Sequence, residues 1–175
     1  KKEAKELSDA FNLRKFRTIS LTGDDSQAKR EDAIARLTGT GAYQGFVDDQ
    51  LDYIFTVDIF NEGVDIPEVN QVIMLRQTES PIVFIQQLGR GLRKFEDKEY
   101  VVILDFIGNY SNSYMIPLAL SGDRSYNKDT LRKYVQSGNR IIPGTSTVHF
   151  DAIAKKRIFA AIDTANLSSA KIIKE

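Results

Sequence analysis

The chain contains no cysteine and only one histidine, His149. The absence of cysteine excludes disulfides and thiolate metal sites, and a single histidine argues against a zinc centre or a histidine-based catalytic relay. No apolar run approaches the roughly 20 residues of a membrane span, and no signal peptide is visible, so we expect a cytoplasmic protein. The sequence also lacks a G-x-x-x-x-G-K-[ST] motif, so it has no phosphate-cradling loop of its own.

The composition allows one sizeable core, with or without an appendage, in a chain of 175 residues. Its hydrophobic fraction of 42% and charged fraction of 27% are ordinary for a soluble globular domain. The chain starts with a helix-like Lys-Lys-Glu-Ala segment and no methionine, from which we expect a fragment of a longer protein.

The net charge of zero hides an asymmetry between two parts of the chain. Residues 1–108 carry 14 Lys and Arg against 19 Asp and Glu, a net of −5, whereas residues 109–175 carry 10 against 5, a net of +5. The basic part is either an ordinary solvated surface or a surface for nucleic acid or a protein partner.

Apolar periodicity predicts alternating helices and strands up to residue 108, and a basic, mainly helical appended region over residues 109–175. The predicted helices of the first part are 2–12, 27–37 and 81–89, and the predicted strands are 17–22, 52–57, 71–75 and 100–106. We therefore expect an α/β fold, a parallel sheet with helices on both faces. In the appended region, helices are predicted at 128–136 and 150–163, with another beginning near Ser168, and residues 108–126 are rich in Gly, Asn, Ser and Tyr.

The segment Gln86 to Arg93, QQLGRGLR, places two arginines three residues apart, Arg90 and Arg93. One reading is a helix C-terminus at which cations favour the negative end of the macrodipole. That reading does not explain Gly89 and Gly91, which would let the backbone approach another group closely. The planar guanidinium forks suit phosphate oxygens, so the segment indicates a nucleotide contact.

This segment resembles motif VI of superfamily 2 helicases and translocases. The resemblance implies that Arg90 and Arg93 are arginine fingers for the terminal phosphate of ATP, and that Gln86 and Gly89 lie beside the nucleotide. It also implies a RecA-like lobe whose opening strand is missing here. ATP and Mg²⁺ would be held by an N-terminal RecA-like lobe of the same polypeptide, and this chain alone would be inactive as an ATPase.

A second segment, Asp58 to Pro67, resembles motif V of the same superfamily. The resemblance assigns Gly63 and Asp65 to ordering the nucleotide site, whereas an ordinary strand-to-loop turn would also suit these residues. Many relatives have a threonine directly before the first aspartate, where it contacts a nucleic-acid phosphate. Here that position is Val57, and Thr56 precedes it on the opposite strand face. Thr56 and Asn61 are the candidate nucleic-acid contacts of this segment, with backbone amides as an alternative.

Thr22 and Gly23 follow the first predicted strand, at the edge where open α/β sheets bind ligands. They resemble the family's segment after motif IV and are candidate nucleic-acid contacts, although an ordinary strand-to-helix turn accounts for them nearly as well.

The resemblance points to the second motor lobe of an ATP-dependent superfamily 2 helicase. The amino-acid sequences of motifs V and VI are most similar to those of bacterial helicases related to restriction enzymes. DNA is the expected partner ahead of RNA. Two other hypotheses are a non-catalytic docking module derived from such a lobe and a standalone nucleotide-binding protein, against which the missing phosphate loop argues. No metal site is expected in this chain.

Overall fold

The computed structural model describes residues 1–57, 66–75, 89, 93–96, 98–106, 112–137 and 147–167. The chain divides into two compact units, Lys1–Asn70 with Arg90–Tyr100 and Gln71–Gly89 with Val101–Glu175. Among the described residues, no helix is long and apolar enough to cross a membrane.

The first unit is built on a pair of parallel strands, β1 (Thr18–Leu21) and β2 (Tyr53–Thr56), in the register Thr18↔Tyr53 to Leu21↔Thr56. Two helices, α1 (Lys2–Asn12) and α2 (Gln27–Thr38), match the predicted ranges closely. The side chain of Ser26 caps α2 by accepting the backbone N–H of Lys29, and Gly39 ends it in the left-handed conformation at φ 65°.

The two helices of this unit pack on opposite faces of the β1–β2 pair. On the α2 face, Leu21, Ala33 and Leu51 form a buried cluster against which Ile19, Leu37 and Ile54 pack. On the α1 face, the Ser8 and Thr18 hydroxyls are hydrogen-bonded at 2.8 Å, and the Phe11 ring lies edge-on to Tyr53 and Phe55. The prediction of parallel strands covered on both faces is therefore confirmed in this unit.

The connection from α2 to β2 is longer than the usual loop and contains two short 3₁₀ helices, η1 (Gly41–Tyr43) and η2 (Val47–Asp49).

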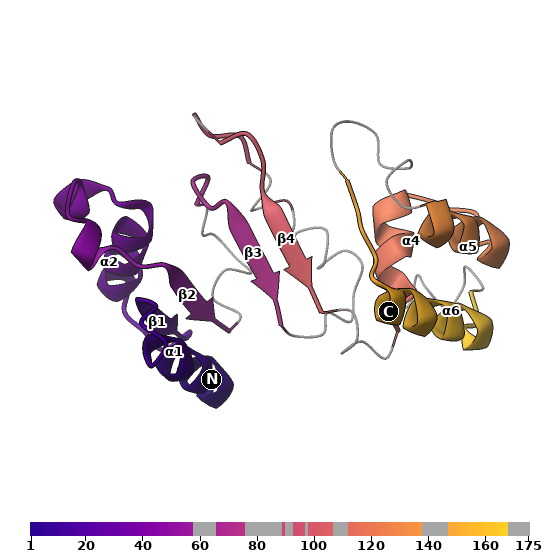
Figure 1. The fold of residues 1–175 in the computed structure, drawn as a ribbon, viewed down its shortest axis with the longest axis horizontal. Coiled ribbons are helices and arrows are strands. Elements are labelled where there is room, and N and C mark those ends of the chain that lie inside the picture. The colour runs from indigo at the N-terminus through magenta and orange to yellow at the C-terminus, as the bar shows by residue number, and fades with distance from the viewer. Residues whose placement is uncertain are drawn as a thin grey trace. The chain divides into compact units, whose positions relative to one another are not determined.

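The second unit contains a second parallel pair, β3 (Gln71–Met74) and β4 (Val102–Asp105), in the register Gln71↔Val102 to Met74↔Asp105. Figure 1 shows these two strands side by side and pointing the same way. Three helices follow: α4 (Met115–Ser121), α5 (Lys128–Ser137) and α6 (Ala152–Thr164). The predictions of α5 and α6 are confirmed, and α4 lies in a segment for which no helix was predicted.

One hydrophobic cluster joins the helices of this unit to its strands. Met74 of β3 is buried in the same cluster as Leu131 and Val135 of α5 and Ile158 and Ile162 of α6. Val72 and Ile103, which face each other across the strand pair, pack against it. The helical segment after β4 therefore shares its core with the strands of this unit.

The predicted helix 81–89 and the predicted helix beginning near Ser168 lie outside the described residues, apart from Gly89, which is helical.

Candidate nucleotide and nucleic-acid site

The carboxyl ends of β1 and β2 lie together because the strands are parallel and Leu21 pairs with Thr56. Thr22 and Gly23 leave β1 at this edge, and Thr56 is the last residue of β2. The structure thus brings together the three predicted nucleic-acid residues that it describes. The fourth, Asn61, lies outside the described residues.

The turn after β1 is organised by the carboxylate of Asp25. Its Oδ2 accepts the backbone N–H of Thr22 at 2.6 Å and the Thr22 hydroxyl at 3.2 Å, and its Oδ1 accepts Lys29 Nζ at 2.6 Å. Lys29, followed by the Thr22 backbone amide, lowers the pKa of Asp25 to about 2. The hydroxyl proton of Thr22 is therefore committed to Asp25, and a phosphate at this turn would need other donors.

Two basic side chains complete the turn. Arg30 Nη2 donates to the Gly23 carbonyl at 2.8 Å, and Lys1 Nζ pairs with Asp24 at 2.5 Å. A Cβ placed on Gly23 would meet no atom within 4 Å, so crowding does not require glycine there. The charges of Asp24 and Asp25 are thus matched by neighbouring lysines, which makes the turn compatible with an anionic ligand.

Sequence reasoning did not single out Asp25. The available signal was its spacing: a carboxylate three residues after Thr22 can reach back to the N–H of that residue, as in a capping box.

Thr56 lies on the α2 face of the strand pair. Side chains alternate along a strand, and Ile54 packs into the α2 cluster, so the half-buried Thr56 shares that face. Its neighbour Val57, at the position where many relatives have threonine, follows on the opposite face.

Of the predicted nucleotide-site residues, the structure describes Gly89 and Arg93, both of them exposed. A Cβ on Gly89 would meet nothing within 4 Å. The other members, Arg90, Gln86, Gly63 and Asp65, lie outside the described residues, and the pairing of Arg90 with Arg93 therefore remains a prediction.

No metal centre forms within the described part of the chain, where no group of three or more His, Cys, Asp or Glu side chains converges. The carboxylates at the candidate edge, Asp24 and Asp25, are each paired with a lysine. The donor set described at this edge therefore suits an anion such as a phosphate better than Mg²⁺.

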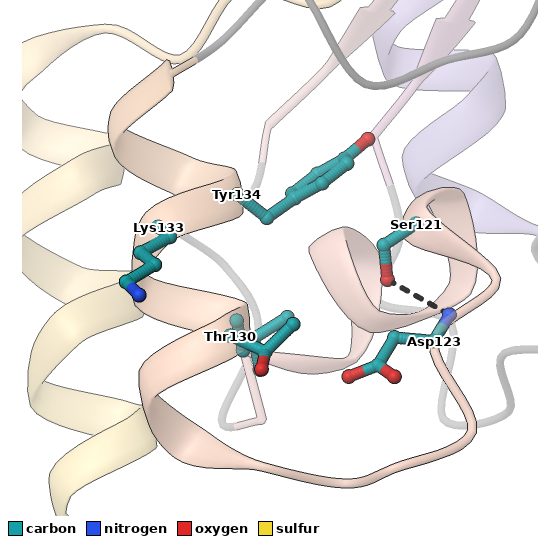
Figure 2. A pocket seen from close by; sticks show the side chains of 6 residues that line it. Ser121, Asp123, Thr130, Lys133 and Tyr134 are labelled. Atoms are coloured by element: carbon teal, nitrogen blue, oxygen red, sulfur yellow. Dashed lines mark hydrogen bonds between the residues drawn. The ribbon is translucent and has the colours of Figure 1, made fainter.

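A pocket of about 360 Å³ lies between α4 and α5, and none of its described lining residues is a predicted site residue. Figure 2 shows Ser121 and Asp123 on one side of it and Thr130, Lys133 and Tyr134 of α5 on the other. The Asp123 carboxylate accepts the backbone N–H and the hydroxyl of Ser125, so it is already satisfied. The pocket separates two packed helices, and we assign it no ligand.

Residues 1–95 match the family described as the helicase conserved C-terminal domain. The chain belongs to this family. The match extends from α1 through both candidate motifs as far as Phe95, and it confirms the resemblance to the C-terminal lobe of superfamily 2 helicases. It stops before β4 and the three C-terminal helices.

Two relatives and one solved structure illustrate the similarity. The "Putative ATP-dependent helicase IRC3" of Saccharomyces cerevisiae is 30% identical over 125 residues, 71% of this chain and 17% of that protein. The "Probable ATP-dependent RNA helicase ddx41" of Dictyostelium discoideum is 30% identical over 97 residues, 54% of this chain and 13% of that protein. The crystal structure of the C-terminal part of the Fun30 ATPase domain aligns with a TM-score of 0.46 at 13% identity, covering 91% of this chain and 44% of that one.

The chain thus spans less than a fifth of the length of these two relatives.

Proposed function

We propose that this chain is the second motor lobe of an ATP-dependent nucleic-acid helicase or translocase. The observation that supports this most is that the family match covers both segments that resemble motifs V and VI, while Thr22, Gly23 and Thr56 lie at one carboxyl edge. Parallel α/β sheets bind their ligands at that edge.

In this proposal the nucleotide is held between a preceding lobe and this one. When bound, ATP with Mg²⁺ supplies the hydrolysable terminal phosphoryl group. Arg90 and Arg93 place positive charge where negative charge develops in the transition state, which makes them the catalytic residues of this chain. Gly63, Asp65, Gln86 and Gly89 shape the nucleotide side of the lobe. An arginine finger contributes roughly 10³–10⁵ in rate to phosphoryl transfer.

The nucleic-acid side of the proposal comprises the turn after β1, Thr56 and Asn61. Because the Thr22 hydroxyl donates to Asp25, the backbone of the turn and the cations Lys29 and Arg30 are the groups that would meet a phosphate. The resemblance of motifs V and VI to those of bacterial helicases related to restriction enzymes favours DNA as the partner. We propose the cytoplasm as the compartment because the sequence shows no signal peptide and no membrane span. The basic segment 109–175 would add sequence-independent attraction to phosphates.

The test is the ATPase activity of the full-length parent, measured without nucleic acid, with single- and double-stranded DNA, and with RNA. We expect stimulation by DNA and no turnover by the 175-residue chain alone, because half of the nucleotide site is missing. Stimulation by RNA alone would keep the motor assignment and overturn the choice of DNA. Mg²⁺-dependent turnover by the isolated chain would overturn the two-lobe proposal.

A further inference from the structure

The long connection between α2 and β2 is held in place by contacts to α2. Arg36 Nε donates to the Asp49 carbonyl at 2.9 Å, and the Leu51 N–H donates to the Arg36 carbonyl at 3.1 Å. The Tyr43 hydroxyl donates to the Asp32 carboxylate at 2.5 Å. The connection is therefore pinned to α2 by hydrogen bonds at several points along its length. Its outward-facing side chains consequently have a fixed geometry.

This pinned connection exposes apolar side chains. Phe46 and Val47 are each 62% exposed. The loop between α1 and β1 also exposes apolar side chains: Leu13 is 87% exposed and Phe16 is 42% exposed. We call these four side chains the amino-edge patch. Single exposed apolar residues are common, but several on adjoining, ordered loops mark an interaction surface.

Arg17 joins the two loops that carry the patch. Its Nη2 pairs with Asp52 Oδ1 at 2.8 Å, its backbone N–H donates to Asp52 Oδ2 at 2.7 Å, and its Nη1 donates to the Val47 carbonyl. The loops meet at the amino ends of β1 and β2, four residue pairs from the candidate site at the carboxyl ends. At about 3.3 Å per residue, the patch lies roughly 13 Å from that site along the strands.

The charges beside the patch are divided by sign. Arg14 and Lys15 follow Leu13 directly in the sequence, and Asp48 and Asp49 follow Val47; all four residues are exposed. We call the first pair the basic rim and the second pair the acidic rim. When the twofold axis of a dimer runs between the two rims, the basic rim of each copy faces the acidic rim of the other. An apolar centre with one basic and one acidic side therefore complements itself.

We propose that the amino-edge patch is a twofold self-association surface, and that its occupant is the patch of a second copy of this chain. The patches would pack against each other, and the basic rim of each copy would face the acidic rim of the other. The proposal is independent of the motor function, because the surface uses none of the candidate site residues.

Sedimentation equilibrium of the full chain tests the apolar centre. We expect a concentration-dependent monomer–dimer equilibrium, and Val47→Ser should weaken the dimer about tenfold or more because it removes exposed apolar area from the contact. Ile153→Ser is the matched control, since Ile153 is a β-branched residue on α6 with 69% exposure and lies outside the patch. A chain that stays monomeric at every concentration overturns the proposal.

Charge reversal tests the twofold geometry. Arg14→Glu with Lys15→Glu makes one variant, and Asp48→Lys with Asp49→Lys makes the other. Each alone should be monomeric because like charges then meet at both rims, whereas an equimolar mixture should form a heterodimer in which both rims attract. Circular dichroism checks that both variants fold. Failure of the mixture to associate, or undiminished association of either variant alone, would show that two copies do not meet through this surface.

Discussion

The two units of the chain differ in what their residues do. The first unit carries the candidate site at one edge of its strands, and its buried α2-side cluster consists of Leu21, Ala33 and Leu51. The second unit carries the more extensive described core, in which strand β3 and all three C-terminal helices take part. The family match spans residues 1–95, which include β3 of the second unit, and ends before β4 and the C-terminal helices. Most of the larger core thus comes from residues that follow the family match.

This difference suggests how the two regions tolerate change. Substitution at the candidate edge should alter turnover with little effect on folding, because its side chains are exposed or bonded to one another. Substitution in the helical core should alter stability first, since its side chains are fully buried and every removed methylene leaves a cavity.

Replacing Arg93 should give the largest effect. In the full-length parent, we expect Arg93→Ala to lower kcat by roughly 10³–10⁵, about 4–7 kcal/mol of barrier, while the affinity for ATP stays largely intact. Arg93→Lys should rescue little, because a point charge cannot reproduce the planar fork. Steady-state turnover and nucleotide-binding titrations separate the two quantities.

The control for this substitution is Lys94→Ala, which removes an adjacent exposed cation and should leave turnover near the wild-type value. Near-normal turnover of Arg93→Ala beside an inactive Arg90→Ala would assign the finger role to Arg90 alone. If both arginine variants stayed active, motif VI would not act on ATP in this protein.

Truncating the helical core should give the next largest effect. Ile158 is fully buried in α6, and we expect Ile158→Ala to lower the free energy of unfolding of the second unit by about 2–5 kcal/mol. Hydrogen exchange should accelerate in α4 to α6 and remain slow in β1 and β2, whereas Leu21→Ala should give the opposite pattern. Exposed Ile153→Ala should have little effect. Loss of protection throughout the chain in both variants would show one cooperative unit and would remove the contrast between the regions.

Removing one positive charge from the helical region should give a smaller effect. If the exposed Lys156 contacts one phosphate, Lys156→Ala should reduce the slope of log affinity against log salt by about 0.9 on duplex DNA. Fluorescence anisotropy with labelled DNA at several salt concentrations gives the slope, and Lys5→Ala on α1 is the control. Equal slopes in wild type and in a Lys156→Ala variant would leave this lysine outside the nucleic-acid surface.

The sequence was sufficient for most elements of the fold and for the position of part of the site. Helices α1, α2, α5 and α6 were predictable because apolar residues recur on one side of each, and the strands because of their short apolar runs. Helix α4 was not, because Met115, Ile116, Pro117 and Leu118 are all buried and a short helix buried on several sides shows no amphipathic period.

Long-range contacts could not be predicted from the sequence, for a different reason. The pairing of Arg17 with Asp52 spans 35 residues, and no local pattern specifies such a partner. The exposed pair Phe46 and Val47 is another case, since apolar residues are expected inside unless a contact elsewhere stabilises them. The parallel arrangement of the strands did follow from the alternation of helices and strands along the chain, and it predicted that Thr22 and Gly23 lie at the carboxyl edge of the sheet.

The smallest predicted effect concerns the turn after β1. The pKa of Asp25 is lowered to about 2 in the folded protein, below the value of about 3.9 for an unfolded aspartate. A lowered pKa means that the carboxylate contributes stability at pH values above about 4, and that this contribution is lost as the pH falls from about 4 through about 2. A titration of the Asp25 carboxyl carbon by NMR should show the low midpoint. Lys29→Ala should raise that midpoint most, because Lys29 is the largest cause of the shift, whereas Thr22→Val should raise it less, because it removes the hydroxyl and keeps the backbone amide. A midpoint near the ordinary value in the wild-type protein would mean that the turn is not closed by Asp25 in solution, which would free the Thr22 hydroxyl to donate to a phosphate.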